Sequence, residues 1–73
     1  MNAREMFEKL GYKEQVDSEH IFYINDNYIF RCQIAFDLAE KTFDAHIGYA
    51  ANDITMKELQ AINKKCKELG WLE

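Results

Sequence analysis

The fold is decided by two neighbouring stretches of the chain, YIFRCQIAFDL at residues 28–38 and TFDAHIGYA at residues 42–50. Every even-numbered residue of the first stretch is apolar, and so are the odd-numbered residues 43–49 of the second. An apolar residue at every second position is typical of a strand with one buried face. The two stretches therefore predict a β-hairpin with a short loop around residues 39–40.

The register expected for this hairpin places both apolar sets on the same face of the sheet. Its predicted pairs are Cys32 with Ile47, Ile34 with Ala45 and Phe36 with Phe43. Residues 21–25 form the preceding strand, and a two-residue turn at 26–27 pairs Ile21 with Cys32 and Tyr23 with Phe30. Residues 12–16 are a short first strand, followed by a turn at residues 17–19.

The two ends of the chain carry matching helix signals. In each, a small polar residue is followed three positions later by Glu, as Asn2 by Glu5 and Thr55 by Glu58, which is the spacing of a capping box. Each segment closes with Leu-Gly-aromatic, where glycine adopts the left-handed conformation that ends a helix. The sequence therefore predicts helices over about residues 3–10 and 56–69. Their apolar stripes are Ala3, Met6, Phe7 and Leu10 in the first helix and Met56, Leu59, Ile62, Cys66 and Leu69 in the second.

These elements predict a single α+β domain over residues 1–73. An antiparallel sheet of four strands, or of three if residues 12–16 fray, follows the first helix and precedes the second. Because each helix has one apolar stripe, both are expected to pack on the one apolar face of the sheet. The predicted core consists of Phe7, Leu10, Phe30, Ile34, Phe36, Phe43, Ile47, Leu59, Ile62 and Leu69.

Length, charge and cysteine content narrow the class of protein. The 73-residue chain carries a net charge of -4, with ten acidic and five basic residues in 1–53 and three acidic and four basic residues in 54–73. An acidic body is unsuited to general phosphate binding. The chain shows no apolar run long enough to span a membrane and no signal-peptide pattern, and its two cysteines fit a reducing compartment. We therefore expect a cytoplasmic protein.

The residue types used in catalysis and metal binding do not occur at the spacings that such chemistry needs. Cys32 and Cys66 are far apart and both fall on predicted core faces, whereas zinc ligands usually come in close pairs. His46 is predicted on the opposite side of the sheet from Cys32, and the single serine, Ser18, lies in a turn. The three glycines are dispersed, so they form no phosphate-binding loop. We therefore expect no enzymatic activity, no metal and no cofactor.

The sheet face away from the helices is predicted to carry an apolar patch with a polar rim. Its large apolar members come from adjacent strands, which is typical of a protein contact surface. The predicted interface consists of Phe22, Ile24, Ile29, Arg31, Gln33, Ala35 and His46. This patch predicts binding of a protein partner, or self-association as a homodimer, which the small core also favours.

The last helix offers an alternative function. Lys57, Lys64, Lys65 and Lys67 make it the one basic stretch of an otherwise acidic chain. Such a stretch is usually a solvated helix face, but it can also contact phosphates.

Both ends of the chain resemble a known group of sequences. AREMFEKLGY at residues 3–12 and ITMKELQAINKKCKELGW at residues 54–71 are similar to small uncharacterised proteins encoded by phages and prophages of Gram-positive bacteria. The resemblance implies a cytoplasmic accessory protein of the bacterial host that modulates a host or phage factor. It supplies no site residues.

The element order also resembles the double-stranded-RNA-binding domain, which has the order α-β-β-β-α at nearly this length. That family carries a Gly-Pro-x-His turn, and this chain has no proline. Its lysines open the last helix, whereas Lys64, Lys65 and Lys67 lie near the helix end here. The likeness is therefore one of topology, which does not determine function.

Overall fold

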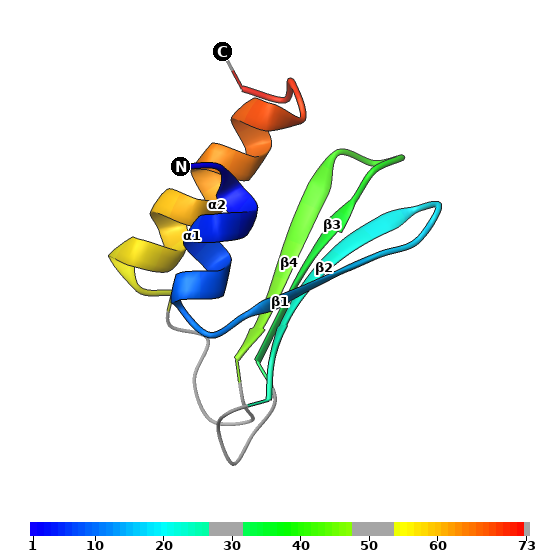
Figure 1. Ribbon diagram of the computed structural model, residues 1–73. Coiled ribbons are helices and arrows are strands. Elements are labelled where there is room, and N and C mark those ends of the chain that lie inside the picture. Colours follow the sequence, from blue (N-terminus) through cyan, green and yellow to red (C-terminus); the bar gives the residue numbers. More distant parts are fainter. Residues whose placement is uncertain (27–31, 48–53, 73) are drawn as a thin grey trace.

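A four-stranded antiparallel sheet carries two helices on one face (Figure 1). The computed structural model describes residues 1–26, 32–47 and 54–72. The elements are α1 (Ala3–Lys9), β1 (Lys13–Val16), β2 (His20–Asn25), β3 (Cys32–Asp37), β4 (Thr42–Ile47) and α2 (Met56–Glu68). The strands lie in chain order, β1-β2-β3-β4. The predicted α+β architecture is confirmed, and the short first strand is present as β1.

Both capping boxes form as predicted. The Asn2 side chain accepts the Glu5 N–H at 2.8 Å, and the Thr55 hydroxyl accepts the Glu58 N–H at 3.1 Å. The helices also end alike, because Gly11 and Gly70 have φ angles of 94° and 78°. The residue after each glycine donates its N–H to a carbonyl five positions back, which is the Schellman ending. These local contacts fix the helix ends without help from the rest of the fold.

The β3–β4 register is confirmed, whereas the predicted β2–β3 register is wrong by four residues. Phe36 pairs with Phe43, as the alternation predicted. In the neighbouring pair Ile21 lies opposite Phe36 and Tyr23 opposite Ile34, not opposite Cys32 and Phe30. The connection is longer than a two-residue turn, because Asn25 pairs with Cys32. A shift by an even number leaves every side chain on its predicted face. Phe30 and residue 27 of the predicted turn lie outside the described residues.

The core lies between the helices and the sheet. Phe7, Ile34, Phe36 and Ile62 are buried there as predicted, while Leu10 and Leu69 are half-buried around its edge. Tyr23 joins them as the centre of an aromatic cluster, with its ring stacked on Phe7 at 3.9 Å between centroids. The side chain of the remaining predicted core residue of β4, Ile47, is outside the described part.

Helix α2 is rotated relative to the predicted stripe. Met56 and Leu59 are 66% and 47% exposed, whereas Glu58 and Ala61 are buried, so the prediction of Leu59 as core is wrong. The rotation has a physical cause in the packing of the two helices. Tyr12, just after α1, donates a hydrogen bond to the buried Glu58 carboxylate. That contact turns Glu58 inward and places Leu59, one residue on, about 100° around the helix.

A second carboxylate joins the opposite ends of the helix pair. Glu68, at the end of α2, accepts the Ala3 N–H at the start of α1 with a 2.7 Å distance. Glu58 at the start of α2 meets Tyr12 just beyond the end of α1, so the two helices run antiparallel. The contacts fix both the direction and the rotation of α2.

Phe43 is also wrongly predicted as core. It points to the helix side of the sheet and its ring lies 5.8 Å from that of Phe36, but it remains 46% exposed. The reason is its place on β4, which forms an edge of the sheet and has a neighbouring strand on one side. In the part of the chain that the structure describes, no helix is both long and apolar enough to cross a membrane.

Candidate functional site on the open face of the sheet

The open face of the sheet, opposite the helices, is formed by alternate residues of all four strands. Two residues from each strand build its centre: Lys13 and Gln15 from β1, Phe22 and Ile24 from β2, Gln33 and Ala35 from β3, and Asp44 and His46 from β4. The register sets them in two rows. One row reads Lys13, Ile24, Gln33 and His46, and the other reads Gln15, Phe22, Ala35 and Asp44. The predicted members Phe22, Ile24, Gln33, Ala35 and His46 therefore do share this face.

The exposure of the apolar members differs from the prediction at Ile24. This side chain is only 5% exposed, so it does not form part of an accessible patch. Its direct neighbours across the strands are Lys13 and Gln33. Phe22 and Ala35 remain half-buried and His46 is exposed. Ile29 and Arg31 lie outside the described residues. Among the residues that the structure describes on this face, the accessible apolar area is therefore centred on the ring of Phe22.

The ring of His20 lies beside that of Phe22 on the open face, and the sequence analysis did not identify it as a site residue. Its ring stacks on Phe22 with centroids 5.4 Å apart and an interplanar angle of 21°. Two carboxylates lie beside the imidazole: Asp17 is 3.6 Å from Nδ1 and Asp37 is 3.5 Å from Nε2. His20 opens β2 directly opposite Asp37, so the β2–β3 register was needed to find the cluster.

The same carboxylates shape the turns at this end of the sheet. Asp17 accepts the backbone N–H groups of Glu19 and His20 at 2.8 and 2.7 Å, and Asp37 accepts those of Ala39 and Glu40 at 3.0 and 2.9 Å. The hydrogen bond from Glu19 lowers the pKa of the Asp17 carboxyl below its ordinary value, and the neighbouring His20 acts in the same direction. This end of the open face is therefore acidic and locally ordered.

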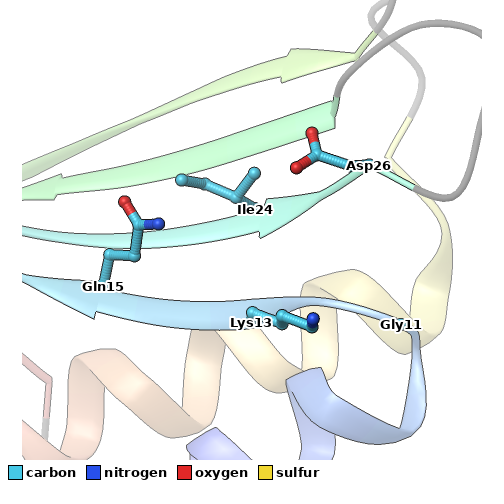
Figure 2. A pocket seen from close by; sticks show the side chains of 5 residues that line it. All are labelled: Gly11, Lys13, Gln15, Ile24 and Asp26. Atoms are coloured by element: carbon cyan, nitrogen blue, oxygen red, sulfur yellow. The ribbon is translucent and has the colours of Figure 1, made fainter.

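A shallow depression lies at the other end of the open face. It has a volume of about 100 Å³ and is lined by Gly11, Lys13, Gln15, Ile24 and Asp26 (Figure 2). Small-molecule sites usually enclose roughly 300–1,000 Å³. The depression is therefore too small for an ordinary organic substrate, although Lys13 and Asp26 give it charges of both signs.

The buried polar groups of the core have structural partners. The Tyr23 hydroxyl donates to Glu14 at 2.8 Å, and burial together with this carboxylate raises the pKa of Tyr23. Cys32 and Cys66 are buried thiols, and burial raises the pKa of Cys66. Among the described residues, no three His, Cys, Asp or Glu side chains gather as a metal site would require.

The lysines of α2 separate into two groups. Lys57, Lys64 and Lys67 are exposed. The side chain of Lys65 is 13% exposed and lies 3.9 Å from Glu68 on the side of α2 that faces α1. The predicted basic stretch therefore presents three of its four lysines to solvent.

Comparison with protein-family models, with curated proteins and with solved structures finds no match to this chain.

Proposed function

We propose that this protein is a small, acidic, non-enzymatic interaction protein that binds a partner protein through the open face of its sheet. The observation that carries the proposal is the stack of His20 on Phe22, which forms an accessible aromatic centre on this face. Aromatic residues at the centre of a patch and polar residues around it are typical of protein interfaces. Gln15 and Gln33 supply neutral hydrogen-bonding groups beside that centre.

The distribution of charge on the open face suggests how a partner would be oriented. Asp17 and Asp37 lie around His20 at one end, whereas the other end carries both Lys13 and Asp26. A partner with basic groups facing the Asp17–Asp37 end would be complementary in charge, and such complementarity favours one orientation and rapid association.

The resemblance of residues 3–12 and 54–71 to phage and prophage proteins supports a bacterial host or phage protein as the partner. We therefore propose an accessory or inhibitory factor that acts in the bacterial cytoplasm. An acidic chain of this size can act in such a role without chemistry of its own, by covering a surface of its target.

Affinity capture from a bacterial host lysate tests the proposal. The wild-type chain should retain one protein at near-equal stoichiometry, and Phe22→Glu should lose it, because a charge would replace the apolar centre of the interface. Leu72→Glu is the matched control, since Leu72 is a 48% exposed apolar residue outside the sheet. Circular dichroism should show that both variants are folded, and Gln33→Arg provides a second disruption if Phe22→Glu unfolds. Equal capture by the wild type, Phe22→Glu and Gln33→Arg would refute a role for the open face.

An alternative function is nucleic-acid binding by the exposed lysines of α2. Lys57, Lys64 and Lys67 would contact phosphates, and the affinity would then fall steeply with salt because counterions are released on binding. A gel-shift titration at low and moderate salt distinguishes the two functions. Salt-sensitive binding that disappears in the Lys64→Glu/Lys67→Glu variant would support the alternative over the protein-binding role.

A further inference from the structure

The two edges of the sheet differ in how well they are protected. β1 has four residues, begins with Lys13 and lies beside α1. β4 has six residues, Thr42–Ile47, and contains neither Lys nor Pro. Sheet edges expose unpaired N–H and C=O groups, and short length, lysine and proline are the usual means of preventing another strand from pairing there. By these criteria β4 is the unprotected edge (Figure 1).

An exposed aromatic side chain lies on the same edge of the sheet. Phe43, on the helix side of β4, is 46% exposed, and its ring lies 5.8 Å from that of the buried Phe36. We call β4 together with the Phe43 side chain the β4 flank.

We propose that β4 pairs with β4 of a second copy of this chain, in an antiparallel, two-fold symmetric homodimer. The two-fold axis of such a contact runs perpendicular to the sheet, so it joins the four strands of each copy and leaves all helices on one side. Directly opposite residues then point to the same face, and one residue of β4 must lie opposite itself. The choice of that central residue fixes every other pair.

The residue pattern of β4 selects Ala45 as the centre. Asp44 then lies opposite His46 of the second copy, and His46 lies opposite Asp44 of the second copy, on the open face. The ring N–H of His46 can donate to the Asp44 carboxylate in either protonation state of the imidazole. On the helix face, Phe43 lies opposite the backbone position of Ile47 of the second copy. A centre at residue 44 would place Asp44 opposite itself, which is destabilising for like charges.

This self-complementarity is the reason for choosing a second copy as the occupant. Asp44 and His46 are two residues apart on one face and flank Ala45 symmetrically, so one strand supplies both halves of two identical pairs. Both side chains are exposed in the single chain and are therefore available. A 73-residue chain buries a limited core of its own, and a second copy would cover the β4 flank.

Analytical ultracentrifugation of charge variants tests this dimer. The wild type should sediment at twice the 8.7 kDa chain mass. His46→Asp brings four carboxylates together, and Asp44→Lys removes the carboxylate acceptor from both His46 ring N–H groups, so each should raise the dissociation constant roughly tenfold from two symmetric cross-strand pairs. The Asp44→Lys/His46→Asp variant restores opposite charges in both pairs and should recover most of the wild-type affinity. Gln15→Asp is the control, because it adds the same charge to the open face at β1.

Each result supports or overturns the proposal. A monomer at high micromolar concentration, or a double variant that dimerises no better than the single ones, would overturn it, and so would equal weakening by Gln15→Asp. Hydrogen exchange provides a second measurement that is independent of the variants, since the β4 amides should become more protected as the concentration rises. The dimer is formed along β4, whereas partner binding is centred on Phe22 and His20 of β2, so failure of the dimer would leave the protein-binding proposal untouched.

Discussion

Removal of one hydroxyl at the end of α1 should test how the two helices are held together. Tyr12 and Glu58 are 3% and 9% exposed, and the tyrosine hydroxyl donates a hydrogen bond to the carboxylate. In Tyr12→Phe the aromatic ring keeps its packing, but one carboxylate oxygen loses a donor inside the protein. The other oxygen still accepts the Thr55 N–H at 2.9 Å, so the capping box remains. The substitution therefore isolates the contact that turns Glu58 toward α1.

The expected loss is large for a chain of this size. A hydrogen bond to a charged group contributes about 1.5–3 kcal/mol, and leaving its partner buried adds to the loss. At about 0.05–0.15 kcal/mol per residue, 73 residues give a free energy of unfolding of roughly 4–11 kcal/mol. We expect Tyr12→Phe to lower the free energy of unfolding by about 2 kcal/mol and the midpoint of thermal unfolding by roughly 10 °C.

Urea denaturation followed by circular dichroism measures this loss, and Tyr23→Phe is the matched control. Its hydroxyl donates to Glu14, which is half-buried and can be solvated when the hydroxyl is removed. We expect the control to lower the free energy of unfolding by about 1 kcal/mol or less. Glu58→Gln removes the buried charge, so it should reduce the effect of Tyr12→Phe in the double variant. The hydrogen bond between Tyr12 and Glu58 does not hold α2 in place if Tyr12→Phe lowers the free energy of unfolding no more than Tyr23→Phe does. The same conclusion follows if the effect of Tyr12→Phe is unchanged in the Glu58→Gln background.

Three further predictions follow from burial and backbone conformation. Ile34→Ala should lower the free energy of unfolding by about 2–5 kcal/mol. Leu59→Ala should lower it by less than about 1 kcal/mol because Leu59 is half exposed. If urea denaturation showed similar losses for the two variants, α2 would have the rotation that the sequence predicted. Gly70→Ala should lower the free energy of unfolding by about 1–2 kcal/mol because the φ angle of Gly70 is 78°, even though an added Cβ would meet no atom within 4 Å. An unchanged midpoint of thermal unfolding would contradict this. Cys66 should react slowly with a thiol reagent at neutral pH, because burial raises its pKa and the thiolate is the reactive form, and rapid labelling of the folded protein would show that the thiol is accessible.

The sequence by itself determined the features that depend on residues close together in the chain. The capping boxes at Asn2 and Thr55 satisfy backbone groups three residues away, and the glycine endings at Gly11 and Gly70 depend on one φ angle each. The β3–β4 register follows from a short loop and two matching alternations, so it was also predictable. For contacts of this range, both partners lie within a few residues of each other, so the sequence pattern alone identifies them.

Tertiary structure alone decided the features in which distant segments compete for the same space. Two rotations of α2 bury an apolar stripe, and the one adopted is selected by Tyr12 and Ala3, which lie more than forty residues away. The β2–β3 register depends on a longer connection, since registers four residues apart bury the same face equally well. The candidate site depends both on features set by the local sequence and on features set by the tertiary structure. Alternation placed Phe22 on the open face, but only the strand pairing brought His20 beside Asp37 and set Ile24 between Lys13 and Gln33 in the register. Side chains on different strands become neighbours only when the sheet has formed.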